Sequence, residues 1–141
     1  MEKLFNWFSV AWALLGGFLV RSLGGYDVVL RAIIWLVALD YISGIIKAFY
    51  LKKLSSEIGF KGILKKATIF IVIALAVVLQ GLIGGAVAIR EIVIMFFICN
   101  EALSLLENAA VLIPIPDALK NVLLQLREKT ENNNQEGDGA E

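Results

Sequence analysis

The stretch that decides the fold is residues 67–89, which read ATIFIVIALAVVLQGLIGGAVAI. It contains no charged residue, and Gln80 is its one strongly polar side chain. About 20 apolar residues, each adding a rise of about 1.5 Å, are enough to cross the hydrocarbon core of a bilayer. The segment does not alternate apolar and polar residues, as a strand of a membrane barrel would. Residues 67–89 therefore predict a transmembrane helix.

Three further apolar segments extend this pattern over most of the chain. Residues 28–51 and 92–113 are long enough to span but carry charges, whereas residues 4–20 carry none and are short for a span. Residues 4–20 should therefore cross a thinned bilayer or lie in its interface. Because lipid cannot hydrogen-bond to the backbone, all four segments should be helical. The sequence predicts an all-α integral membrane protein with three or four transmembrane helices.

The C-terminal part of the chain has a different composition. Pro114 and Pro116 should end the fourth apolar segment. Residues 117–130 have an apolar face at helical spacing, which predicts a short amphipathic helix on the cytoplasmic side. Residues 131–141 are polar and rich in Asn and Gly, which predicts a disordered tail. Residues 1–130 should thus form one membrane-embedded domain.

Composition excludes several classes of protein. Hydrophobic residues make up 59% of the chain, against about 45–50% in soluble domains. The net charge is zero, which does not suit a nucleic-acid partner. There is no histidine and one cysteine, Cys99, so an intrachain disulfide and a Cys/His zinc site are excluded. No motif of a hydrolase, nucleotide-binding loop or metalloprotease is present, so we expect neither an enzyme nor a cofactor.

The orientation of the chain in the membrane follows from its short loops, because short loops rich in Lys and Arg stay in the cytoplasm. The most basic predicted loop spans residues 52–66 and has Glu57 as its single acidic residue. This loop and the C-terminus should be cytoplasmic, and residues 21–27 should lie outside. The N-terminus is inside if residues 4–20 span, and outside if they lie flat. The lysines of the predicted cytoplasmic loop are Lys52, Lys53, Lys61, Lys65 and Lys66.

Polar residues in two of the apolar segments are candidate functional residues, since ionisable groups are costly in lipid. One helical face of residues 28–51 carries Asp40, Ser43 and Lys47, and Asp40 needs a partner from another helix or another copy. One reading is a pore-lining or subunit-contact face, a second is interhelical hydrogen bonding, and a third keeps carboxyl groups protonated. The matching residues in the fourth segment are Asn100, Glu101, Ser104, Glu107 and Asn108.

Several blocks of the chain together resemble the toxin-secretion/phage-lysis holin family. They run in the family's order over more than half of the chain, and each alone is a weak signal. The N-terminal residues 1–27 match only in being hydrophobic. The blocks are Asp40–Gly44, Lys53–Ile63, Lys65–Lys66, Asn100–Ala110, Pro114–Pro116, Leu119–Lys120 and Leu126.

The resemblance implies a function without catalysis. Holins of this kind come from double-stranded DNA phages, accumulate in the bacterial cytoplasmic membrane and oligomerise. At a set time they permeabilise it, so that a cytosolic endolysin reaches the cell wall; relatives near clostridial toxin loci are proposed to help toxin release. The lipid bilayer and other copies are then the expected partners. An antiholin that delays a partner holin, and a small channel or transporter subunit, remain alternatives.

Overall fold

The computed structural model describes the backbone of residues 2–136 and the side chains of residues 6–129. All regular structure in this range is α-helical, which confirms the all-α part of the predicted fold class. The helices are α1 (Glu2–Ser22), α2 (Val28–Tyr50), α3 (Ser56–Leu82), α4 (Ile89–Ala109) and α5 (Asp117–Glu136).

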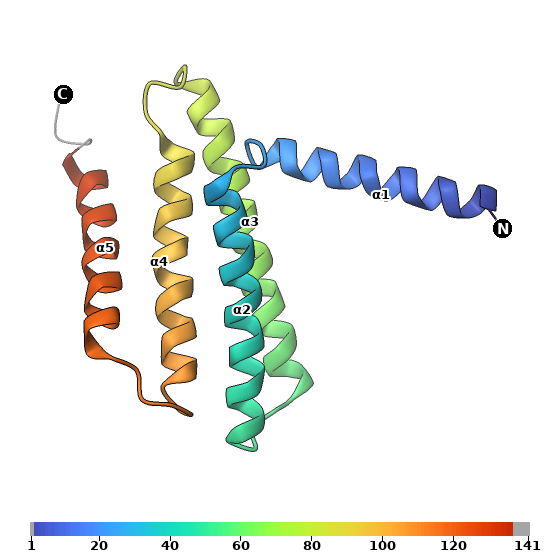
Figure 1. Ribbon diagram of the computed structural model, residues 1–141. Helices are drawn as coiled ribbons and strands as arrows, with labels where there is room; N and C mark the ends of the chain where they lie inside the picture. The colour runs from blue at the N-terminus through green and yellow to red at the C-terminus, as the bar shows by residue number, and fades with distance from the viewer. Residues whose placement is uncertain (1, 137–141) are drawn as a thin grey trace.

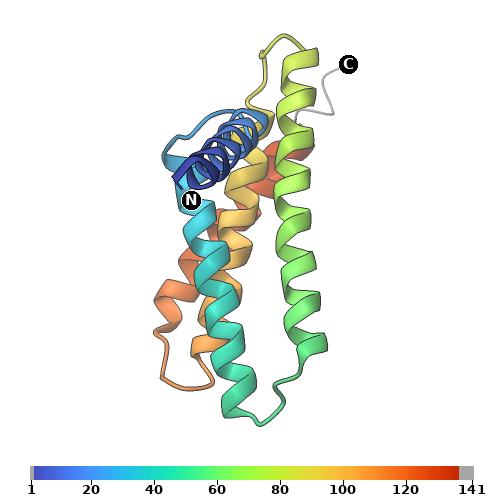
Figure 2. The same cartoon turned by 90° about the vertical axis from the view of Figure 1, so that its right-hand side faces the viewer.

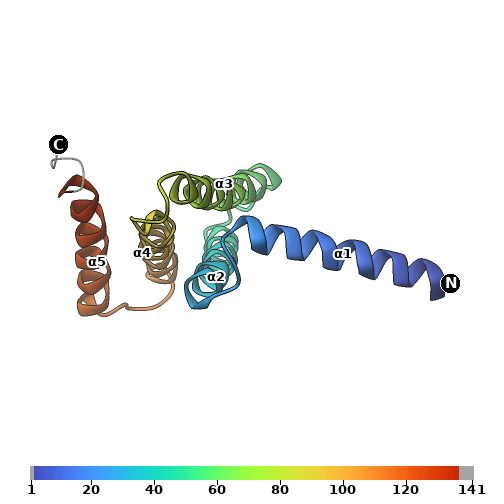
Figure 3. The same cartoon turned by 90° about the horizontal axis from the view of Figure 1, so that it is seen from above.

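Helices α2 to α5 run up and down side by side, whereas α1 extends crosswise from one end of the bundle (Figure 1). Helices α2 and α4 are parallel to each other, and α3 and α5 run in the opposite direction (Figures 1 and 2). Seen along the bundle, α4 lies between α5 on one side and α2 and α3 on the other (Figure 3). Helix α4 is thus the central element of the bundle.

Capping residues set where the second and third helices begin. The side chain of Asp27 accepts a hydrogen bond from Leu30 N at 2.9 Å, and Ser55 accepts one from Ile58 N at 3.2 Å. Because Ser55 caps α3, most of the predicted loop at residues 52–66 is helical, and the loop prediction is wrong there. Lys61, Lys65 and Lys66 therefore lie on α3, and only Lys52 and Lys53 lie in the connection.

Two other boundaries also differ from the sequence-based prediction. Helix α3 ends at Leu82 and α4 begins at Ile89, so their connection lies at residues 83–88, inside the predicted segment 67–89, and not at residues 90–91 between the two predicted segments. Gly84 and Gly85 allow this turn, because both have a positive φ that other residues rarely adopt. Helix α5 continues to Glu136, which shortens the predicted disordered tail, and residues 137–141 lie outside the described part of the chain.

The bundle is apolar on its outside and has a small apolar core. The core joins α2, α3 and α4 through Leu30, Ile33, Ile69, Ile73 and Ile94. Outward-facing residues are equally apolar: Trp35 on α2 is 64% exposed and Ile71 on α3 is 67% exposed. Such continuous exposed apolar surface is rare on soluble monomers and is what contact with lipid requires.

Two helices of the described residues, α2 and α3, are long and apolar enough to cross a membrane. This number is below the three or four predicted from the sequence. Helix α3 has 27 residues and is about 40 Å long, which exceeds the roughly 30 Å of a hydrocarbon core. Its first turns can therefore stand outside the core while the rest crosses it.

One of the contacts between α2 and α3 places the Tyr41 ring of α2 against Gly59 and Gly62 of α3. The Tyr41 hydroxyl donates to the carbonyl oxygen of Gly59 at 3.5 Å. A Cβ atom added at Gly62 would lie 3.2 Å from Tyr41 Cε2, which is tighter than most Cβ contacts, so the ring would have to shift by a few tenths of an ångström. Gly62 therefore lets α3 approach α2 closely at this level.

Replacing Gly62 with leucine should push α3 away from Tyr41 and lower the free energy of unfolding by about 1–3 kcal/mol, as overpacking typically does. Thermal unfolding in detergent micelles, followed by circular dichroism, measures this. Gly81→Leu on the same helix is the matched control, because no atom lies within 4 Å of its added Cβ. Equal melting of the two variants would mean that the Tyr41 contact does not hold α3 in place.

Candidate functional site

A lysine from α3 bridges two carboxylates in the interior of the bundle. Lys66 Nζ donates to Asp40 Oδ2 on α2 and to Glu101 Oε2 on α4. The side chains of Lys66, Asp40 and Glu101 are 12%, 8% and 5% exposed. One ammonium group thus connects all three core helices.

Asn108 extends this bridge along the interface between α2 and α4. Its Nδ2 donates to Asp40 Oδ1 at 3.1 Å and to Ser43 Oγ at 3.2 Å. Its Oδ1 accepts from Lys47 Nζ at 3.3 Å. We call the connected set the ion network: Asp40, Ser43, Lys47, Lys66, Glu101 and Asn108.

The ion network balances its charges internally, with two carboxylates and two ammonium groups. The partner that Asp40 was predicted to need comes from another helix of the same chain. Interhelical hydrogen bonding is therefore present for Asp40, Ser43, Lys47, Glu101 and Asn108. Lys66 forms ion pairs with both carboxylates.

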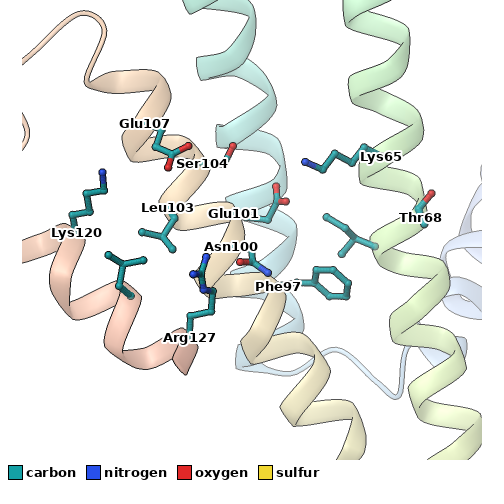
Figure 4. A pocket seen from close by; sticks show the side chains of 12 residues that line it. Lys65, Thr68, Phe97, Asn100, Glu101, Leu103, Ser104, Glu107, Lys120 and Arg127 are labelled. Atoms are coloured by element: carbon teal, nitrogen blue, oxygen red, sulfur yellow. The ribbon is translucent and has the colours of Figure 1, made fainter. Parts of the chain in front are cut away.

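The remaining polar residues of α4 face a different neighbour. Asn100, Ser104 and Glu107 line a cleft of about 530 Å³ between α3, α4 and α5, as Figure 4 shows. Lys65 of α3 and Lys120 and Arg127 of α5 line the same cleft. We call it the α4–α5 cleft. The polar residues predicted to share one side of α4 therefore divide between two surroundings.

A second, smaller cleft of about 160 Å³ opens between α2 and α3. Asp40, Lys66 and Asn108 line it together with apolar residues of both helices. Since Glu101 lines the α4–α5 cleft and Asp40 lines this one, the Lys66 bridge lies between the two. In the described residues, no group of three His, Cys, Asp or Glu side chains comes together as metal ligands do.

Arg90 forms a second buried polar centre at the end of the bundle where α1 joins α2. Its Nε donates to the carbonyl oxygen of Leu23 at 2.6 Å, and Nη2 donates to that of Gly25 at 3.2 Å. Nη1 and Nη2 both bind the Asp27 carboxylate, at 2.7 and 3.2 Å, and Nη1 also reaches Glu91 at 3.0 Å. The five N–H groups of this guanidinium are all used. We call this the Arg90 clasp.

The Arg90 clasp fixes the conformation of the connection between α1 and α2. Gly24 has a φ of +85°, and a Cβ added there would lie 2.4 Å from Arg90 Nε. The guanidinium beside Asp27 lowers the pKa of that carboxyl below its usual value of 3.8. At the same place, Gln80 Oε1 accepts from Arg90 N at 2.8 Å and ties the end of α3 to the start of α4.

Sequence reasoning missed two residues of these sites. Lys66 was assigned to a cytoplasmic loop, although it shares a helical face with Ile69, Ile73 and Ala76, the buried residues of α3. That spacing is the signal that would have identified it. Arg90 lies between the predicted apolar segments 67–89 and 92–113, and no sequence signal links it to Leu23 and Gly25, because these two partners are backbone carbonyls.

Comparison with known proteins gives a family. A model of the bacteriophage holin family matches residues 17–128. The "uncharacterized 14.9 kDa protein in nagH 3′ region" of Clostridium perfringens is 38% identical over 131 residues, which cover 92% of this chain and 99% of the relative. An uncharacterized protein of Listeria monocytogenes is 34% identical over 125 residues, 88% of this chain and 87% of the relative. No solved structure matches significantly. The family match covers most of the chain, and the apolar surface of the helices agrees with it. The chain therefore belongs to the bacteriophage holin family.

Proposed function

We propose that this chain is a holin that oligomerises in the bacterial cytoplasmic membrane and permeabilises it at a timed point. The lesion would let an endolysin, or a toxin, leave the cytosol. The ion network carries this proposal, because it places polar and charged groups inside a bundle whose outside is apolar. As a monomer, such a bundle presents its apolar outside to lipid. Once several copies associate and their helices rearrange, its polar interior can face a water-filled lesion.

The arrangement of helices supports a topology with three spans. Helix α4 runs parallel to α2 at the centre of the bundle, and the Glu101 carboxylate is paired with Lys66, which lowers the cost of placing α4 in lipid. Helix α1 runs crosswise to the spans, and Trp7 and Trp12 on it are exposed, as in helices that lie in a membrane interface. We therefore place α1 flat on the outer face and α2, α3 and α4 across the bilayer.

Exposed lysines support a cytoplasmic position for the end of the bundle that is distant from α1. Lys52 and Lys53 lie in the connection between α2 and α3, and Lys61 is exposed on the first turns of α3. The positive-inside rule keeps such a cluster on the cytoplasmic side. The C-terminus of α4 lies at the same end, so residues 110–116 would be cytoplasmic as well.

The test is inducible expression in a bacterium, with and without a cytosolic endolysin, while optical density and membrane potential are followed. We expect abrupt depolarisation after a delay, and lysis only when the endolysin is present. A strain that carries the endolysin alone is the control. Steady growth with an intact potential would refute the proposal. If co-expression then delayed lysis by another holin, the chain would instead be an antiholin.

A further inference from the structure

A groove of about 650 Å³ opens at the end of the bundle where α2 passes into α3. Its walls come from the last turns of α2, from the connection between α2 and α3, and from the connection between α4 and α5, which lies at the same end (Figure 1). Its five apolar and aromatic side chains are between 43% and 73% exposed. We call it the connection groove, and it is lined by Ile46, Phe49, Tyr50, Lys52, Leu54 and Leu112.

The connection groove lies beside cations that have no counter-charge. Lys52 lines the groove and Lys53 follows it in the chain. Both are exposed, and neither forms an ion pair with a carboxylate of the described residues. Between residues 41 and 89 the sequence has one acidic residue, Glu57, which pairs with Lys61 at 2.7 Å. The two lysines therefore leave a net positive charge next to an apolar surface.

The backbone holds Lys52 in a conformation that lysine does not favour. Lys52 N donates to the carbonyl oxygen of Phe49 at 3.0 Å. Lys53 N donates to that of Ala48 at 2.9 Å, so α2 ends in a Schellman motif. Lys52 takes the position of this motif that usually belongs to glycine, with a φ of +55°. The other residues of the described chain with a positive φ are Gly24, Gly25, Gly84 and Gly85. A lysine at this position therefore points to a role for its side chain.

An anionic phospholipid matches both parts of this surface. Lysine ammonium groups next to a membrane attract anionic headgroups, and acyl chains suit an apolar groove on the outside of the bundle. Tyr50 adds a ring with an apolar body and a polar tip, which suits the boundary between chains and headgroups. A soluble phosphate compound would leave the groove unfilled. A zwitterionic lipid would fill it, but its own cation competes with the lysines for the phosphate.

We propose that the connection groove binds one anionic phospholipid, with its headgroup phosphate on Lys52 and Lys53 and an acyl chain over Phe49 and Leu54. The proposal rests on the proposed function, because it takes this end of the bundle to lie at the headgroup level of a membrane. It adds the chemical class of a lipid ligand and the residues that select it. Since Leu112 follows α4 in the chain, the bound lipid connects the ends of α2 and α4.

The first experiment measures binding at the groove by fluorescence quenching. Trp7→Phe, Trp12→Phe, Trp35→Phe and Phe49→Trp are combined in the full-length chain, so that one tryptophan reports on the groove. The chain is reconstituted into phosphatidylcholine vesicles with increasing fractions of brominated phosphatidylglycerol, which quenches a tryptophan that it contacts. We expect the groove to bind phosphatidylglycerol about 25-fold more tightly than phosphatidylcholine, a factor of about five for each lysine.

A tryptophan elsewhere on the lipid-facing surface is the control for position. Leu75 on α3 is 54% exposed and lies in a stretch of the sequence without charged residues. Leu75→Trp, with phenylalanine at the three native tryptophan positions, should be quenched equally by brominated forms of both lipids. An equal preference for phosphatidylglycerol at this position and at the groove would reflect general surface charge and would overturn the proposal.

The second experiment removes the two lysines from the chain that carries the groove tryptophan. Lys52→Gln with Lys53→Gln should reduce the preference for phosphatidylglycerol to within about twofold of that for phosphatidylcholine. Arg21→Gln with Lys129→Gln removes two other exposed cations and should keep the preference. The same preference in both double variants, whether retained or lost, would overturn the site. Displacement of the brominated lipid by glycerol phosphate would also overturn it, because the ligand would then be a free phosphate compound.

The third experiment separates the binding role of Lys52 from its part in the fold. Lys52→Gly relieves the positive φ, so the melting temperature in zwitterionic micelles should rise by about 3 °C. In the vesicle measurement the same substitution should lower the preference for phosphatidylglycerol about fivefold. Stability and binding then change in opposite directions. A preference that stayed unchanged would assign Lys52 to the fold alone and would overturn its role in the site.

These measurements can fail independently of the proposed function. They require neither lysis nor one orientation of the chain, because the vesicles carry phosphatidylglycerol in both leaflets. A groove preference in a chain that never depolarises a bacterium would support the lipid site and refute the holin function. Absence of the preference in a chain that depolarises cells on time would overturn the lipid site and leave the holin function intact.

Discussion

Replacing Lys66 with methionine is expected to destabilise the bundle by about 3–5 kcal/mol, the typical cost of removing one partner from a buried ion pair. The reason is geometric. Lys66 neutralises both Asp40 and Glu101, whose side chains are 8% and 5% exposed, and no other cation donates to either carboxylate in the described residues. Without the ammonium group, two carboxylates face each other with a single amide donor on Asp40.

Melting of the purified chain in micelles, followed by circular dichroism, measures this loss. Lys66→Arg keeps the charge and should melt close to the native chain. A charge-free network, with Asp40→Asn and Glu101→Gln added to Lys66→Met, should recover most of the loss because no unpaired charge remains. If Lys66→Met alone melted with the native chain, the Lys66 bridge would not contribute to the stability of the bundle.

The Lys66 bridge also shows what hydrophobic periodicity can and cannot predict. The apolar residues of 67–89 predict a membrane helix without any tertiary information, and α3 contains most of this stretch. The position where the helix begins depends on Ser55, whose cap extends α3 through the lysines that were read as a loop. The charge of Lys66 suggested a position in solvent. Lys66 nevertheless lies inside the bundle, because it shares a helical face with the buried residues Ile69 and Ile73.

Helix α4 shows a different limit. Its polar residues were predicted to share one side, and at about 100° per residue they do occupy one broad sector. Glu101 and Asn108 lie at one edge of this sector and meet α2 and α3, whereas Asn100 and Glu107 lie towards the other edge and meet α5. The sequence predicts which side of α4 is polar. The packing of α2 and α3 on one side and of α5 on the other decides which polar residues join the ion network and which line only the α4–α5 cleft.

Replacing Arg90 with leucine is expected to lower the free energy of unfolding by about 2–3 kcal/mol, because the Leu23 and Gly25 carbonyls lose buried donors and Asp27 loses its partner. The loss is below that for Lys66, since the Asp27 side chain is 46% exposed and water can replace part of the contact. Arg90→Lys should recover little of it, because one ammonium group cannot form the paired contacts of a guanidinium.

Acid provides the decisive check on this second prediction. The pKa of Asp27 is lowered in the folded chain, so its ion pair stabilises the fold above the ordinary carboxyl pKa of 3.8 and is lost as the pH falls through the lower, folded value. The difference in melting temperature between the native chain and Arg90→Leu should therefore be constant near neutral pH and shrink below about pH 4. Glu57→Gln, which removes an exposed pair with Lys61, should show no such convergence of comparable size.

A difference in melting temperature that stayed constant down to pH 2 would assign the effect of Arg90 to its carbonyl contacts alone. The connection between α1 and α2 would then be held by its backbone, with Asp27 acting only as the cap of α2.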